Sequence, residues 1–199
     1  MKKFELTNEF VTNMFGTKLF RIRALVEFGD VEAGELGGYV EKESNLGHDD
    51  NAWVYGDARV YDNALVYDNA RVYGDAQVSG DARVYDNALV CGNARVYDNA
   101  RVYGDAWVYG NARVCGDALV CGDARVCGNG DYAYAHGFGS VNRTTTFFRL
   151  KDGGVGVRCG CFYGTLAQFR DKIRETHGET KKAQEYLMLA DLMKLRFEK

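Results

Sequence analysis

A six-residue repeat occupies the centre of the chain and constrains its fold more than any other feature. Alanine recurs at every sixth position from Ala52 to Ala124, and a valine follows each of these alanines by two residues. The rest of the unit is a variable residue between Ala and Val, then Tyr or Cys (once Ser79), then Gly or Asp, then Asp or Asn. A repeat this short and this regular is typical of a parallel β-helix.

Each unit predicts one short strand and one corner. Ala and Val lie two residues apart, so they point to the same face of a strand, and we expect this face to be the interior. The two residues that close the unit tolerate tight turns and positive φ. Proline, which would remove a donor from the strand ladder, does not occur in the chain. Three units per coil predict a triangular coil of about 18 residues.

Weaker copies of the unit extend the repeat in both directions. They reach residue 38 upstream, with a two-residue slip near Asp49, and residue 138 downstream. We therefore predict an all-β fold with a small α+β cap at its C-terminal end. The expected parts are an N-terminal β cap over 1–37, the β-helix over 38–138, and a C-terminal cap of one hairpin and two helices over 139–199.

The C-terminal cap is predicted from turn and capping signals. Two runs rich in β-branched and aromatic residues, TTTFFRL and VGVRCGCF, flank the turn sequence KDGG and predict a hairpin. Thr165 and Gln168 form a capping box at the start of a helix that should end at Gly178. A last helix is expected over about 180–197, with Tyr186 and Met193 among the residues of its buried stripe.

The repeat resembles that of a known superfamily. The spacing from Val60 to Ala64 is similar to the hexapeptide repeat of left-handed β-helix proteins, which include trimeric acyltransferases. The tyrosine-rich variants VYGDA and VYDNA most resemble the YdcK-like proteins and related phage and prophage proteins. This resemblance implies a single-stranded left-handed β-helix. It also implies a phage-encoded protein and, as an alternative function, an acyltransferase activity.

Charge and hydropathy exclude several classes of protein. The net charge of −3 argues against a surface for nucleic acid or for an anionic membrane, both of which need a basic excess. No segment approaches the roughly 18 continuous apolar residues of a membrane span. Lys2 and Lys3 are followed by Glu5 rather than by an apolar run, so no signal peptide is expected. These observations predict a cytoplasmic protein that binds neither nucleic acid nor membrane.

The six cysteines do not suggest a metal site or a cofactor. Four of them occupy the Tyr position of the repeat and are interpreted as substitutions at a corner: Cys91, Cys115, Cys121 and Cys127. Cys159 and Cys161 form a C-x-C pair without a second cysteine pair nearby, which favours a strand over a zinc site. We therefore predict neither metal nor cofactor.

The variable position between Ala and Val faces outward, and one column of it is unusually apolar. Every eighteenth residue places Trp53, Arg71, Leu89, Trp107 and Arg125 on one side of the β-helix. Large apolar side chains on a surface seek a partner. Our hypothesis is that Trp53, Leu89 and Trp107 form the interface of a homo-oligomer, a trimer or a dimer. The alternative is that a terminal segment folds back and covers this column.

Sequence reasoning favours a non-catalytic role. Of the three histidines, only His136 stands near the coils in a way that suits a general base, and no long loop interrupts the repeat to build a substrate pocket. We expect a rigid interaction module that binds a host or phage protein. Two alternatives stay open: an acetyl-CoA-dependent acyltransferase that uses His136, and a protein that sequesters a small ligand between subunits.

Overall fold

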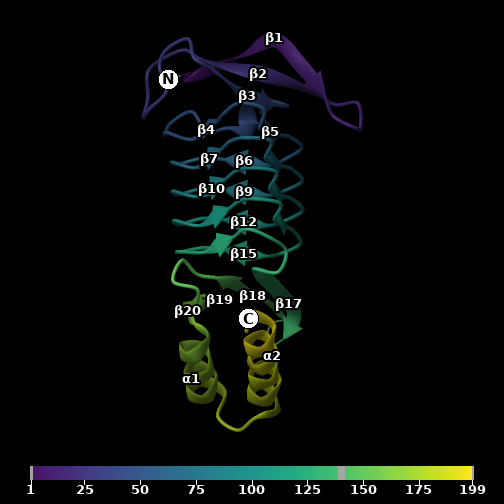
Figure 1. The fold of residues 1–199 in the computed structure, drawn as a ribbon, viewed down its shortest axis with the longest axis vertical. Coiled ribbons are helices and arrows are strands. Elements are labelled where there is room, and N and C mark those ends of the chain that lie inside the picture. Colours follow the sequence, from purple (N-terminus) through teal and green to yellow (C-terminus); the bar gives the residue numbers. More distant parts are fainter. Residues whose placement is uncertain (1, 139–141, 199) are drawn as a thin grey trace.

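The computed structural model describes residues 2–138 and 142–198 as a rod with a cap at each end. The N-terminal strands cover one end of a stack of coils, and a small sheet with two helices covers the other (Figure 1). The coils between them contain strands of only two residues. These are β4 (Trp53–Val54), β5 (Arg59–Val60), β6 (Leu65–Val66), β7 (Arg71–Val72), β8 (Gln77–Val78), β9 (Arg83–Val84), β10 (Leu89–Val90), β11 (Arg95–Val96), β12 (Arg101–Val102), β13 (Trp107–Val108), β14 (Arg113–Val114), β15 (Leu119–Val120) and β16 (Arg125–Val126).

The coils stack in a strict 18-residue register. Val72 pairs with Val90, and Val90 pairs with Val108, in parallel ladders. The strands form three stacks, which are β3-β5-β8-β11-β14, β16-β13-β10-β7-β4 and β15-β12-β9-β6. Every Ala and Val of the repeat from Ala52 to Val126 is fully buried. The prediction that these two positions face the interior is therefore confirmed.

The backbone conformation at the corners explains why each unit has Gly or Asp at its fifth position. The first corner residue has a positive φ at every unit that carries Asp there, with values from 56° to 59° at Asp62, Asp68, Asp86 and Asp98. Glycine holds the same position in the other units, for example Gly80 with a φ of 66°. The carboxylate also accepts a hydrogen bond from the next coil, as Asp62 Oδ2 does from the Gly80 N–H at 3.0 Å. This bond offsets the strain that a side chain carries in the left-handed region.

The second corner residue and the aromatic position form ladders along the rod. Asn51 donates from Nδ2 to Oδ1 of Asn69 at 3.1 Å, and Asn69 donates to Asn87 at 3.4 Å. At another position of the unit, the rings of Tyr67, Tyr85 and Tyr103 stack with centroids 5.0 and 4.9 Å apart. Adjacent coils are therefore joined by side-chain contacts as well as by the backbone, which stiffens the rod.

The N-terminal cap is a continuation of one face of the coils. β1 (Phe4–Thr12), β2 (Lys18–Ala24) and β3 (Leu36–Val40) pair antiparallel in that order, and β3 then pairs in parallel with β5. A short 3₁₀ helix, η1 (Glu43–Asn45), follows. Val40 pairs with Val60, and Leu46 bridges to Val66. The two residues of each pair are twenty positions apart in the sequence, instead of the eighteen of the regular coils. The predicted two-residue slip near Asp49 is thus confirmed.

Buried Lys3 fastens the cap where the slip occurs. Its ammonium group donates to the backbone oxygens of Asp50 and Ala52, both at 2.8 Å, and lies 3.4 Å from the Asp50 carboxylate. Burial lowers the pKa of Lys3, while Asp50 acts in the opposite direction. The lysine satisfies carbonyl groups that the irregular corner leaves without a strand partner.

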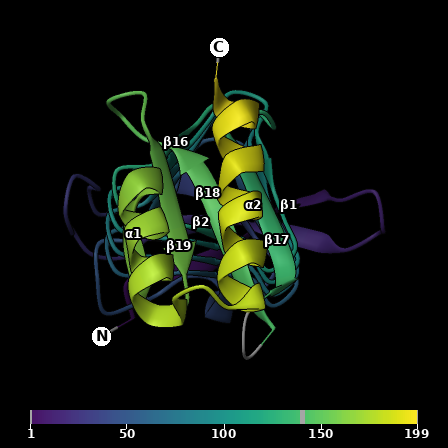
Figure 2. The same ribbon diagram turned by 90° about the horizontal axis from the view of Figure 1, so that it is seen from below.

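The C-terminal cap is an antiparallel sheet covered by two helices (Figure 2). The sheet has the order β17 (Tyr132–Phe138), β18 (Arg143–Arg149), β19 (Val155–Cys159) and β20 (Phe162–Thr165), followed by α1 (Leu166–His177) and α2 (Lys181–Phe197). The turn between β18 and β19 and both helices agree with the predicted positions. The capping box also forms, since Thr165 N donates to Gln168 Oε1 at 2.8 Å and Gln168 N donates to Thr165 Oγ1 at 3.3 Å.

The coils end earlier in the structure than residue 138, where the sequence predicted their end. Residues 132–138, which we assigned to the β-helix, form β17 and pair antiparallel with β18. The physical reason is size: Tyr132 and Phe138 fall where the repeat has its inward Val, and the narrow interior does not admit their rings. Tyr132 instead packs against the end of the coil core. Residue 139, where we placed the start of the C-terminal cap, lies outside the described residues.

Candidate functional site

The apolar outward column does not form one continuous exposed surface. Trp53 is fully buried, and its ring meets those of Phe28 and Phe4 edge-on at centroid distances of 5.3 and 6.1 Å. The assignment of Trp53 to an oligomer interface is therefore wrong. The N-terminal segment folds back over this end of the column, which is the alternative that the sequence left open. Trp53 belongs to the core that joins the cap to the coils.

The remaining apolar part of the column consists of two residues. Leu89 pairs directly with Trp107 in neighbouring strands, and the Trp107 side chain is 44 % exposed. The guanidinium of Arg125 lies 4.4 Å from the Trp107 ring centroid, and Arg71 forms an ion pair with Asp30 at 3.1 Å. Charged neighbours thus flank Leu89 and Trp107 on both sides along the column. The result is a small apolar patch with a polar rim.

The most exposed large apolar side chains lie on the two caps. Met14 and Phe15, in the turn between β1 and β2, are 84 % and 79 % exposed. On α2, Met188, Leu192 and Leu195 are 71 %, 56 % and 69 % exposed. Their spacing of four and three residues places the three on one face of the helix. We call them the α2 outer stripe.

The α2 outer stripe was not predicted from the sequence, because only one apolar face, the buried one, was expected on this helix. The opposite face is the expected one: Tyr186, Ala190 and Met193 are buried against the sheet and α1. A second apolar row was visible in the spacing of Met188, Leu192 and Leu195. A helix that is apolar on two faces has either a second covering element or a partner.

The candidate base His136 lies on β17, on an open surface. Its Nδ1 is 2.9 Å from Thr144 Oγ1 and 3.9 Å from the Asp117 carboxylate, and its side chain is 59 % exposed. A carboxylate near an imidazole is an arrangement that bases use, but exposure to water weakens it. The structure brings no other histidine to His136.

The other two histidines have structural surroundings. His48 stacks on Phe4 at a centroid distance of 4.4 Å and accepts the Lys3 backbone N–H at its Nδ1, 3.2 Å away. Burial lowers the pKa of His48, which keeps the ring neutral and able to accept this bond. His177 is the last residue of α1 and stacks against Tyr186 at 5.9 Å.

All six cysteines are free. The four in the repeat lie at the corners as interpreted, whereas Cys159 ends β19 and Cys161 lies in the turn before β20, so the expectation that both belong to one strand is wrong. Cys121 follows Tyr103 in its column and is buried, which raises the pKa of its thiol. Cys159 accepts a hydrogen bond from Thr145 Oγ1 at 3.2 Å. Within residues 2–138 and 142–198, no three His, Cys, Asp or Glu side chains gather as a metal site would require.

The fold defines a β-solenoid repeat protein, since parallel coils of short strands form its whole central part. Segments of the coils match the family model described as YdcK Beta solenoid repeat. The matched segments are residues 52–67, 58–74, 64–80, 76–92, 94–110, 106–122 and 112–128. Both caps lie outside these matches. A search of curated proteins found none that matches the chain.

Neither α1 nor α2, nor any other helix in the described part of the chain, combines the length and the apolar character needed to cross a bilayer.

Proposed function

We propose that this protein is a non-catalytic, rigid interaction module whose C-terminal cap binds a protein partner, a host or a phage protein. The observation that carries the proposal is the α2 outer stripe, which exposes three large apolar side chains on one helical face. A helix that presents such a face is a common recognition element, because its anchors enter an apolar groove on the partner. The phage-like resemblance of the repeat supports the choice of partner.

Stiffness of the coils supports the same role. The Ala and Val residues of the repeat are all fully buried in the core, and each coil is bonded to the next through backbone and corner side chains. A rod of this kind holds its two caps at a fixed distance and orientation (Figure 1). We also propose that the coils are left-handed, as in the superfamily that the repeat resembles.

Charge reversal in the α2 outer stripe tests partner binding. Leu192→Glu combined with Leu195→Glu should reduce recovery of the partner from host cells about tenfold or more, because both anchors are replaced by carboxylates that resist desolvation. The fold should survive, since both side chains point away from the core. Quantitative mass spectrometry after affinity capture with wild-type and variant bait measures the difference.

A matched control keeps this test specific. Lys182→Glu combined with Gln184→Glu alters charge at two exposed polar positions of the same helix and should leave recovery unchanged. If no protein depends on Leu192 and Leu195 for recovery, the proposed partner site is wrong. Turnover of an acyl donor by the purified protein would contradict the non-catalytic assignment.

Self-association through Leu89 and Trp107 is the second part of the proposal. Leu89→Arg combined with Trp107→Arg should dissociate a trimer or dimer without unfolding it, because Arg already occupies the column at Arg71 and Arg125. Light scattering coupled to size exclusion gives the mass of each species. Leu65→Arg, at an outward position of another face, is the matched control and should leave the assembly intact. A wild-type mass equal to one chain would contradict self-association.

A further inference from the structure

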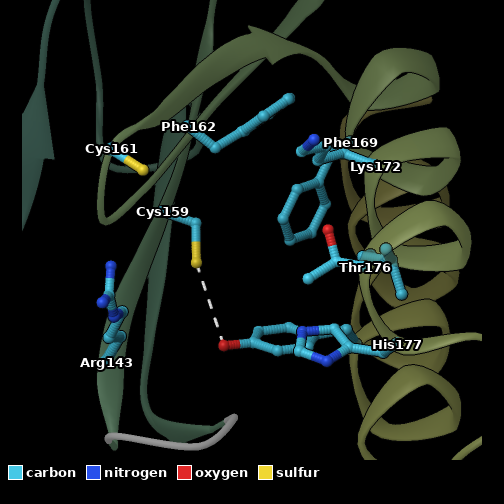
Figure 3. Close-up of a pocket in the computed structure, with 10 residues that line it drawn as sticks. Arg143, Cys159, Cys161, Phe162, Phe169, Lys172, Thr176 and His177 are labelled. Atoms are coloured by element: carbon cyan, nitrogen blue, oxygen red, sulfur yellow. Dashed lines mark hydrogen bonds between the residues drawn. The ribbon is translucent and has the colours of Figure 1, made fainter.

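The C-terminal cap contains a cavity that the proposed partner site does not use. It has a volume of about 280 Å³ and lies between the sheet edge and the two helices. Figure 3 shows side chains from β18, β19, β20 and α1 around it, with Cys159 and Thr176 directed into the space. Pockets for small molecules generally measure roughly 300–1,000 Å³, so this one suits a ligand with a single ring.

One side of the cavity is a preformed aromatic wall. Phe162 and Phe169 lie with ring centroids 5.4 Å apart, and the Phe169 ring meets that of Tyr186 edge-on at 5.9 Å. The three rings come from β20, α1 and α2, and Phe169 and Tyr186 are also buried in the cap core. Their positions are therefore held by packing, which lowers the entropic cost of binding a flat ring against them.

The floor of the cavity is polar but neutral. Tyr186 donates its hydroxyl proton to the Phe138 carbonyl at 3.3 Å, and Cys159 Sγ lies 3.9 Å from the same hydroxyl. Burial and the neighbouring Cys159 raise the pKa of Tyr186 to about 12. The phenol thus stays protonated near neutral pH and adds no negative charge to the cavity.

The cavity is lined by basic residues and by no carboxylate. The basic residues are Arg143, Lys172 and His177. Lys172 has an exposed partner in Glu175 at 2.9 Å, whereas Arg143 forms no ion pair with a described residue. An arginine without a carboxylate partner beside an apolar cavity favours an anionic ligand.

The backbone near Arg143 leaves room for its guanidinium. Gly160, in the turn between β19 and β20, has a φ of 58°, and a Cβ built there would collide with Arg143 Nη1. Figure 3 places Arg143 across the cavity from His177, which ends α1. An anion is disfavoured at the carboxyl end of a helix, so its negative group should lie on the Arg143 side.

We propose that this cavity binds a small aromatic carboxylate, with the ring against Phe162 and Phe169 and the carboxylate on Arg143. The aromatic wall selects a flat apolar ring, and the guanidinium selects the carboxylate by charge-assisted hydrogen bonds. This site is separate from the α2 outer stripe, whose side chains point to solvent.

Fluorine NMR with two matched probes tests the proposal. 4-Fluorobenzoate should give a saturable shift or broadening of its fluorine signal. 4-Fluorobenzyl alcohol, which keeps the ring but has no charge, should bind with an affinity at least about tenfold lower. Arg143→Gln should weaken 4-fluorobenzoate binding by about tenfold while leaving the melting temperature unchanged, because this side chain is exposed. Arg113→Gln, the same change on the coils, should have no effect on binding.

A blocking variant locates the bound probe. Thr176→Trp places a large ring into the cavity from an exposed position of α1 and should abolish the 4-fluorobenzoate signal. Equal affinity for the carboxylate and the alcohol would overturn the proposal, as would unchanged binding in Arg143→Gln or Thr176→Trp. Absence of any saturable signal from 4-fluorobenzoate would overturn it as well.

Discussion

Val90→Asp should destabilise the protein by about 3 kcal/mol or more. Val90 is fully buried in the middle of the rod, between Val72 of one coil and Val108 of the next. The interior around it consists of Ala and Val side chains, which offer neither a hydrogen bond nor a counter-charge to a carboxylate. Urea or thermal unfolding followed by circular dichroism measures the loss.

The penalty of Val90→Asp should depend on pH in a defined direction. Burial would raise the pKa of the new carboxyl in the folded state, so folding would favour its protonated form. The loss of stability should therefore be smallest in acid and should grow as pH rises above about 3.9, the pKa of an exposed Asp. A penalty that is independent of pH between acid and neutral conditions would contradict this burial.

Arg95→Gln is the matched control for the coil interior. Arg95 is exposed at the outward position of β11, and its neighbour Gln77 already holds Gln in the same column. The change should alter the free energy of unfolding by less than about 0.5 kcal/mol. A large loss at Arg95, or a near-normal stability of Val90→Asp, would mean that the inward and outward positions have been exchanged.

Trp53→Ala should cost about 3–5 kcal/mol, the usual range for removing a large buried aromatic side chain. Trp53 is fully buried and contacts Phe4 and Phe28, so its removal opens a cavity between the N-terminal cap and the coils. We expect the cap to loosen first, and limited proteolysis should then cut within residues 2–35. Denaturant unfolding and proteolysis together measure the effect.

The chain supplies an exact counterpart in the second tryptophan of the same column. Trp107→Ala should cost only about 1 kcal/mol, because Trp107 is 44 % exposed, lies outside the coil core and contacts Arg125 and Leu89 at the surface. Trp53 observed alone in a Trp107→Phe background should have blue-shifted fluorescence, as expected for a ring without water. Equal losses from Trp53→Ala and Trp107→Ala, or a red-shifted Trp53, would contradict the burial of Trp53.

The structure of the coils could be predicted from local sequence rules, because every six-residue unit contains the residues that determine its strand and its corner. The Ala–x–Val alternation sets which side chains enter the core, and the Gly or Asp before Asn or Asp sets the corner with its positive φ. The 18-residue register then follows from stacking identical units. The two-residue slip near Asp49 was readable for the same reason, as was the capping box of Thr165 and Gln168.

Contacts between segments that are far apart in the sequence could not be predicted from local rules. Trp53 and Trp107 occupy the same position of the unit, and only the fold of residues 2–35 over one end buries the first and leaves the second exposed. The assignment of β17 to the C-terminal sheet depends likewise on its pairing with β18. The cavity beside Arg143 needs five elements brought together. The sequence by itself determined the repeating coil, because its contacts recur at a constant spacing, whereas the tertiary structure alone decided which outward side chains the caps cover.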